Sequence, residues 1–230
     1  MMDAKQLGIL LQFSSPSLPI GGFSYSQGLE AAVELGLVHH EHSALAWILS
    51  QLKGNLTHCD GPIWLLLYQA WQAQDYTTLK RWSQWFYASR ETQEARQETR
   101  QMAQAMLRLL QDLQWGDEDE RALLQEAGMQ TYPTLHSYAM YKAGISEADG
   151  LLAYLFSWLE NQVMAAIKSV PLGQTAGQRI IQQVLEHLDA ARQEAKLRAQ
   201  QEPPALETLA PMYGIVSACH ETLFSRLFRS

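Results

Sequence analysis

The segment Gly173 to Arg179, GQTAGQR, is the first candidate for chemistry, because glycine-rich loops that open helices can bind phosphate. A P-loop needs four residues between its glycines and a Gly-Lys-Ser/Thr ending that follows a strand. Here three residues separate the glycines, Gln178 stands where lysine is needed, and the preceding segment has a helical pattern. The segment is therefore not a P-loop.

The same segment indicates a helix start that is shaped for contact. Thr175 and Gln178 have the spacing of a capping box, which predicts a helix from Thr175 with Arg179 projecting just beyond its first turn. The planar guanidinium suits a carboxylate or phosphate on a partner, and an internal salt bridge is the alternative. Lys168 falls in the last turn of the preceding predicted helix, where the helix dipole favours a cation.

Two clusters contain residues that bind transition metals, namely His39 to His42 and Cys219 to Glu221. Neighbouring residues on a helix point in different directions, whereas a metal site needs i, i+4 pairs or convergence from separate elements. We therefore expect no resident metal or cofactor, and His220 is only a weak candidate ligand.

No catalytic residue is expected. The sequence contains neither a nucleophile elbow nor an HExxH motif. Glu30 and Glu34 have i, i+4 spacing, but such a pair is more typical of two solvated charges than of an acid and a base. The sequence therefore favours a protein that is not an enzyme.

The most constrained backbone lies between Ser14 and Gly36, where two prolines and a Gly-Gly pair indicate a sharp turn. Ser24 and Gln27 have capping-box spacing, which predicts a helix from Tyr25 with Phe23 just outside it. Gly28 then lies inside a helix at a cost of about 1 kcal/mol, which indicates close approach of another backbone. Phe23 and Tyr25 either contact a neighbour or fill this protein's own core.

The last residues read as a short amphipathic helix. Its apolar stripe comprises Leu223, Phe224, Leu227 and Phe228, and Arg226 and Arg229 add positive charge. Isolated helices shorter than about 12 residues are marginal, so the segment must dock. Either it packs on its own body or it inserts into a groove on a partner.

Helical periodicity dominates, which predicts an all-α, single-domain bundle of roughly ten helices over residues 1–230. Asp60 reads as the N-cap of the helix predicted over 60–74. Glu94 and Glu98 are expected on solvated faces, and Ser146 with Asp149 predicts a cap. The segment 151–170 is expected to be the most buried. Helices are predicted over 42–56, 60–74, from 77 or 78, 91–115, 133–144, 151–170, 175–200 and from about 206 past 212.

Composition limits the environment and the partners. The net charge of −7 argues against nucleic-acid binding. The two cysteines form no CxxC pair, which suits a reducing cytoplasm. The longest apolar run, 63–68, is far shorter than the roughly 18 residues of a membrane span, so no membrane association is expected.

Three motifs in order resemble the urease accessory protein UreF family: SPSLPIGGFSYSQGLE from Ser15, VPLGQTAGQR from Val170, and the ending HETLFSRLFRS. The resemblance implies a cytoplasmic helical chaperone for nickel insertion. Its implied partners are the accessory GTPase (UreG-like), a second accessory scaffold (UreD/UreH-like), the urease apoenzyme and a second copy of itself. It also implies that residues 1–24 and 221–230 respond to partners.

The residue patterns and the resemblance together give a partner-binding set of ten residues, in which Arg179 is favoured over Lys168 and Glu30. The set comprises Phe23, Tyr25, Glu30, Lys168, Gly173, Gln178, Arg179, Arg226, Leu227 and Phe228. Three functions stay open at this point. The chain either bridges the GTPase to the scaffold on urease, regulates GTP hydrolysis by acting directly on the GTPase active site, or carries nickel on its histidines.

Overall fold

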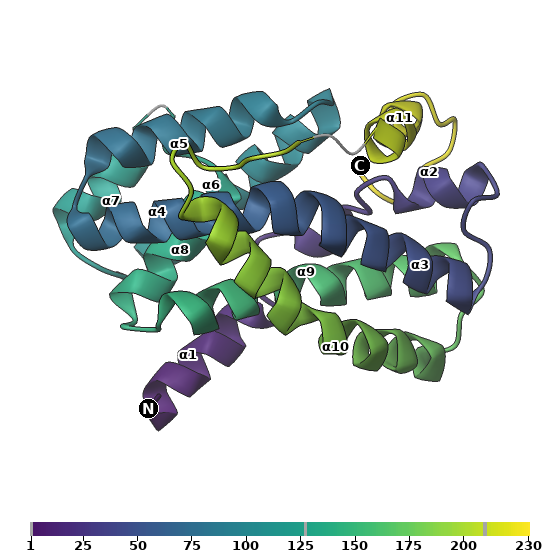
Figure 1. Ribbon diagram of the computed structural model, residues 1–230, viewed down its shortest axis with the longest axis horizontal. Helices are drawn as coiled ribbons and strands as arrows, with labels where there is room; N and C mark the ends of the chain where they lie inside the picture. Colours follow the sequence, from purple (N-terminus) through teal and green to yellow (C-terminus); the bar gives the residue numbers. More distant parts are fainter. Residues whose placement is uncertain (1, 127, 209–210) are drawn as a thin grey trace.

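A computed structural model describes residues 2–126, 128–208 and 211–230, and every regular element in these ranges is helical (Figure 1). The prediction of an all-α fold is confirmed. The α-helices are α1 (Ala4–Ser14), α2 (Leu29–Glu34), α3 (Glu41–Gln51), α4 (Gly61–Ala73), α5 (Tyr76–Ser89), α6 (Gln93–Asp112), α7 (Glu118–Leu124), α8 (Tyr132–Lys142), α9 (Glu147–Ser169), α10 (Gln174–Ala199) and α11 (Pro211–His220). A 3₁₀ turn, η1 (Gly22–Ser24), and a π-helix, η2 (Leu52–Asp60), complete the set.

The core forms where α4 crosses α8, with α9 and α10 packed alongside (Figure 1). Trp64 and Trp71 of α4 are fully buried, and their indole N–H groups donate to Nδ1 of His136 and to the carbonyl of Thr134. The indoles of Trp64 and Trp71 therefore both have a hydrogen-bond partner, as burial of a polar group favours. Helix α8 is buried along most of its length, more completely than the 151–170 segment that was expected to be the most buried.

Helix starts follow the capping signals in part. Ser146 accepts the backbone N–H of Asp149 at the start of α9, as predicted. The capping box at Thr175 is wrong, because α10 begins at Gln174 with Gly173 as its N-cap. Asp60 stands at the predicted N-cap position of α4, but its side chain makes no capping hydrogen bond, because η2 joins α3 and α4 into one helical run and the carboxylate pairs with Arg90.

The helix predicted from Tyr25 begins instead at Leu29. Gln27 and Gly28 both have positive φ, 52° and 78°, which interrupts a right-handed helix before it can form. Gly28 is thus a cap and not an interior residue. A Cβ on it would lie 3.5 Å from the backbone nitrogen of Ser217, so another backbone does approach closely, and it belongs to α11 of the same chain.

The C-terminal predictions need two corrections. The final helix starts at Pro211, since residues 206–208 are not helical, and residues 209–210 lie outside the described ranges. Residues 221–230, the tail, form no helix. Figure 1 shows α11 beside α2 at one end of the molecule, and the tail turns back there. Side-chain partners from distant segments determine its path.

Candidate functional site

The tail docks in a groove that we call the tail seat, formed by the loop Ser24–Gln27, Glu30 of α2, Glu94 and Glu98 of α6, and His220 of α11. The backbone N–H groups of Ser26 and Gln27 donate to the main-chain oxygen of Ser230 at 2.6 and 3.1 Å. The N–H of Arg229 donates to the carbonyl of Ser24 at 2.8 Å. The left-handed conformation of Gln27 helps to direct these two N–H groups to one acceptor.

Glu30 is the central anchor of the tail. Its side chain is buried, and its two carboxylate oxygens accept the backbone N–H groups of Leu227 and Phe228 at 2.6 and 3.1 Å. The same carboxylate lies 2.9 Å from Nε2 of His220. Helix α2 is only six residues long, so this anchor is held by α2 packing against α9 and α11.

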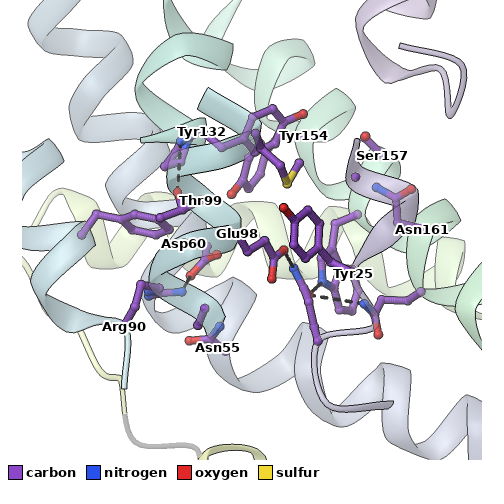
Figure 2. Close-up of a pocket in the computed structure, with 18 of the residues that line it drawn as sticks. Tyr25, Asn55, Asp60, Arg90, Glu98, Thr99, Tyr132, Tyr154, Ser157 and Asn161 are labelled. Atoms are coloured by element: carbon purple, nitrogen blue, oxygen red, sulfur yellow. Dashed lines mark hydrogen bonds and ion pairs between the residues drawn. The ribbon is translucent and has the colours of Figure 1, made fainter. Parts of the chain in front are cut away.

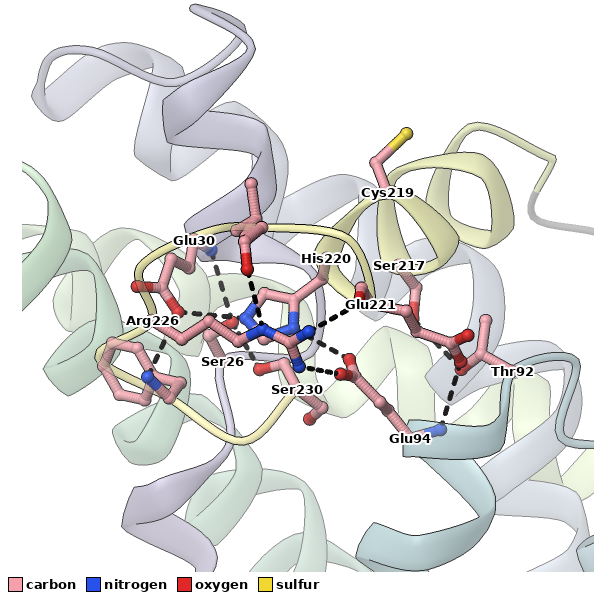
Figure 3. A network of polar contacts seen from close by, with 12 residues as sticks. Ser26, Glu30, Thr92, Glu94, Ser217, Cys219, His220, Glu221, Arg226 and Ser230 are labelled. Carbon is pink, nitrogen blue, oxygen red and sulfur yellow. Dashed lines mark hydrogen bonds and ion pairs between the residues drawn. The ribbon is translucent and has the colours of Figure 1, made fainter.

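Glu94 and His220 continue the network across the groove (Figure 3). Nδ1 of His220 lies 2.8 Å from Glu94, whose other oxygen accepts a hydrogen bond from Arg226 at 2.7 Å. His220 is completely buried between the two carboxylates. Glu221 accepts the backbone N–H of Gln93, so it helps to cap α6. Both ring nitrogens of His220, the weak candidate for metal binding, are therefore already engaged by the carboxylates of Glu94 and Glu30.

The expectation that Glu94 and Glu98 are solvated is wrong. Both are buried, because α6 lies with this face against the loop and the tail. Glu98 accepts hydrogen bonds from Nε2 of Gln27 at 2.6 Å and from the hydroxyl of Ser230 at 3.2 Å. The helical pattern of α6 alone carries no signal of this, since its partners lie more than 70 residues away in the sequence.

The seat orients some apolar side chains outward and others inward. Phe228 is buried, whereas Leu227 is 73% exposed and Phe224 is fully exposed. Lys168 lies over the ring of Phe228 at 5.5 Å and over the ring of Phe23 at 5.9 Å. Phe23 is 54% exposed, which makes an apolar surface with a cationic centre beside the tail.

Of the two alternatives considered for Tyr25, contact with a neighbour or burial in this protein's own core, the structure shows burial. Its side chain is buried, and its hydroxyl donates to the side-chain carbonyl of Gln101 at 2.7 Å. Burial raises the pKa of this hydroxyl, and the charge on Glu98 raises it further. Tyr25 therefore fills this protein's own core, while Phe23 faces outward.

The second region of motif residues is the α9–α10 corner, which we define as Lys168–Arg179. Gly173, Gln178 and Arg179 are exposed, as a contact surface requires. Arg179 forms a bidentate ion pair with Glu41 at the start of α3, at 2.8 and 2.5 Å. The hydrogen bonds from Arg179 lower the pKa of Glu41. The internal salt bridge considered from sequence is present, on an exposed surface.

A cavity of about 70 Å³, with both polar and aromatic side chains in its lining, shares Tyr25, Gln27 and Glu98 with the tail seat (Figure 2). Arg90 and Asp60 form an ion pair at 3.0 Å on its wall, where only about a tenth of each side chain is exposed. Glu98 also lines the cavity, and burial raises the pKa of its carboxyl to about 7. Four phenols, those of Tyr25, Tyr132, Tyr154 and Tyr213, complete much of the lining.

The histidine cluster is not assembled into a metal site. Nδ1 of His40 accepts the backbone N–H of Ser43, so this ring caps α3. Across residues 2–126, 128–208 and 211–230, no group of three or more His, Cys, Asp or Glu side chains is placed to hold a metal ion. Within the same ranges, no helix is both long and apolar enough to span a membrane.

Comparison with known proteins gives the family. The UreF family model matches residues 38–185. The urease accessory protein UreF of Bordetella parapertussis is 54% identical over 220 residues, which cover 96% of this chain and all of that protein. The chain belongs to the UreF family. The UreF of Cupriavidus metallidurans is 48% identical over 230 residues and is covered from end to end.

A third relative, the bifunctional urease accessory protein UreEF of Bordetella bronchiseptica, is 55% identical over 229 residues. All of this chain is matched, but it spans only about half of that longer relative, 53% of its length. The UreF portion of that protein is thus joined in one polypeptide to another accessory module. The relatives are accessory proteins of urease by name, which agrees with the resemblance seen in the three motifs.

Proposed function

We propose that this chain is a non-enzymatic urease maturation factor that acts in the cytoplasm. It bridges the accessory GTPase (UreG-like) to a second accessory scaffold (UreD/UreH-like) bound on the urease apoenzyme. Nickel is the cargo of this assembly and not a resident cofactor of the chain. The role is positional: the chain holds the GTPase where nucleotide hydrolysis is coupled to nickel release.

The tail seat is the observation that supports this proposal best. Buried charged groups fix the tail, yet Phe224 and Leu227 point outward from it. Exposing large apolar side chains on a rigid support is unfavourable for an isolated protein and is typical of a protein interface. Phe23 and Lys168 extend the same surface, which gives the scaffold an apolar contact with a positive centre.

We also propose that the chain is a homodimer, formed through a separate apolar groove of about 360 Å³ between α1, α9 and α10. Its lining is almost entirely apolar and includes Leu11, Phe156 and Leu185. Leu11 and Leu185 are 60% and 44% exposed. A second copy is the expected occupant, because α1 projects from the body (Figure 1) and its exposed Leu7 and Leu11 form an apolar edge that a second copy can cover.

Size-exclusion chromatography with light scattering tests the dimer. Leu11→Asp is expected to convert it to a monomer. Leu197→Asp, on α10 but outside the groove and equally exposed, is the matched control and is expected to leave the mass unchanged. A monomeric wild type, or equal behaviour of the two variants, contradicts the dimer proposal.

Reconstitution tests the bridging role. The purified chain is mixed with the UreG-like GTPase and the UreD/UreH-like scaffold, separately and together, and complexes are isolated through a tag on the scaffold. We expect the GTPase to be retained only when this chain is present. Phe224→Asp, at a fully exposed side chain, is expected to weaken scaffold binding. Phe228 is not substituted, because its side chain is buried and an aspartate there would disturb the fold. Retention of the GTPase without this chain contradicts bridging.

One observation keeps direct action on the GTPase as a second candidate. Arg179 is exposed and has the charge and geometry of a group that enters a nucleotide site, although Glu41 must release it first. Glu30 is a poor candidate for this role, because it is buried under the tail. GTP turnover measured with wild type and with Arg179→Ala distinguishes the two functions: bridging predicts the same turnover for both.

A further inference from the structure

The hydrogen bonds around His220 determine its charge. Both ring nitrogens lie within 2.9 Å of a carboxylate oxygen, Nδ1 at Glu94 and Nε2 at Glu30. Ionised carboxylates only accept hydrogen bonds, and a neutral imidazole has one N–H. A neutral ring would therefore leave one nitrogen lone pair facing a carboxylate, inside a site without solvent.

Protons on the carboxylates do not resolve this conflict. Both oxygens of Glu30 already accept backbone N–H groups, from Leu227 and Phe228. Glu94 accepts Arg226 at one oxygen and faces His220 with the other. Three of the four carboxylate oxygens therefore accept from donors other than the ring, and the guanidinium of Arg226 on Glu94 and the two backbone N–H groups on Glu30 favour the ionised form of both residues. The imidazole must then donate from both nitrogens.

Charge balance leads to the same result. Glu30 and Glu94 bring two negative charges into the buried network, and Arg226 supplies one positive charge. An unpaired buried charge is strongly destabilising. An imidazolium at His220 balances the four groups, whereas a neutral ring leaves one carboxylate uncompensated.

We infer that His220 is a positioning residue, held as an imidazolium between Glu30 and Glu94, that fixes the tail so that Phe224 and Leu227 are presented to a protein partner. The inference rests on the proposed function for the identity of that partner. His220 itself is completely buried and touches no partner. It acts through Glu30, whose carboxylate holds the tail backbone at two consecutive N–H groups.

The protonation state is measured directly by nitrogen-15 NMR of the ring in the full-length chain. We expect both ring nitrogens of His220 to carry hydrogen at neutral pH. The exposed His42 on α3 is the internal reference for an imidazole without buried partners. A spectrum with one protonated and one bare nitrogen at His220 overturns the inference.

The positioning role is tested with His220→Gln and the double variant His220→Gln/Glu94→Gln. The first leaves two carboxylates against Arg226 alone, and the second restores one negative charge to one positive charge. Hydrogen exchange is followed at the amides of Leu227, Phe228 and Arg229, all of which donate hydrogen bonds in the seat. We expect at least tenfold faster exchange in His220→Gln and an intermediate rate in the double variant.

Scaffold capture is measured on the same samples, with His42→Gln as the matched control and circular dichroism as the check on folding. Capture is expected to fall with the single variant and to recover in part with the double variant. A space-filling role for the ring predicts that a second substitution worsens both readouts, so such additive loss overturns the inference. Unchanged exchange in His220→Gln also overturns it. If wild type captures no scaffold, the bridging function fails, while the NMR and exchange measurements still decide the state of His220.

Discussion

The tail seat and the α9–α10 corner both contain motif residues, but they place the same kinds of charge in opposite environments. In the seat, Glu30 and His220 are buried and bind across nearly 200 residues of sequence. At the corner, Arg179 is 53% exposed and pairs with Glu41 on the surface. The comparison teaches that a charged motif residue can act by shaping a surface or by being part of one.

The free-energy cost of removing a charged residue also differs between the tail seat and the corner. Removing one member of a buried ionic network leaves an uncompensated charge, whereas an exposed ion pair is screened by water and contributes little. We therefore expect substitutions in the seat to change stability and partner binding together. Substitution of Arg179, the exposed charge at the corner, is expected to change binding alone.

Glu30→Ala is expected to have the largest effect. It removes the acceptor for two tail N–H groups and the partner of a buried imidazole, and loss of one member of such a pair costs about 3–5 kcal/mol. The free energy of unfolding is measured by urea denaturation. Limited proteolysis should cleave the tail early. Glu34→Ala, on the same helix and exposed, is the control, and equal losses in the two variants contradict the role of Glu30.

Glu98 is expected to make stability depend on pH. Burial raises its pKa in the folded protein to about 7 from the ordinary value of 4.5. The folded state therefore binds more protons than the unfolded state between these values, so the stability contributed by the protonated carboxyl is present below about pH 4.5 and is lost as pH rises through 7. At 1.36 kcal/mol for each pH unit, the loss is on the order of 3 kcal/mol.

The neighbours of Glu98 decide how this test is controlled. Gln27 and Ser230 donate hydrogen bonds to Glu98 and lower its pKa, while the charge on Asp60 raises the pKa and the charge on Arg90 lowers it. Glu98→Gln keeps the shape and removes the titration. Stability curves measured from pH 4.5 to 8 should be flatter for Glu98→Gln than for wild type. Parallel curves for the two proteins would show that Glu98 does not titrate in this range, which contradicts its role in the pH dependence of stability.

Gly177→Ala sharpens the comparison at the corner. A Cβ at Gly177 would lie 2.5 Å from Cδ1 of Ile167 and 3.1 Å from Cγ1 of Val163, where α10 packs on α9. Such overpacking costs about 1–3 kcal/mol. Gly173→Ala is the matched control, since nothing lies within 4 Å of its Cβ position. Thermal denaturation should separate the two; equal melting temperatures contradict the packing role of Gly177.

Much of the fold could be predicted from local sequence patterns. The apolar periodicity indicates an all-α protein, and the Ser146 cap is confirmed because its hydrogen bond joins residues three apart. Phe23 and the corner residues Gly173, Gln178 and Arg179 are exposed, and their contact with a partner stays a prediction. The confirmed predictions depend on interactions within one helix or one turn.

The tail seat could not be predicted, because its contacts join distant segments. Glu94 looks like any charged residue of a solvated helix until His220 and Arg226 are brought beside it. The tail has a helical apolar stripe, yet its N–H groups gain more from Glu30 and Ser24 than from a marginal short helix. Likewise, the capping pattern at Ser24 fails because Gln27 and Gly28 adopt positive φ to receive the tail.

Arg179→Ala is expected to have the smallest effect on stability and the clearest effect on partner binding. Its ion pair with Glu41 is exposed, so its loss should leave the melting temperature of the chain nearly unchanged. Retention of the GTPase in the three-protein complex should fall, because a planar set of donors is removed from the corner. Glu41→Ala breaks the same pair while keeping the guanidinium, and it should leave retention intact. If the two variants lose retention equally, the ion pair with Glu41 is what matters and not the free guanidinium. The corner would then act like the tail seat, where ionic contacts within the chain hold a binding surface in place.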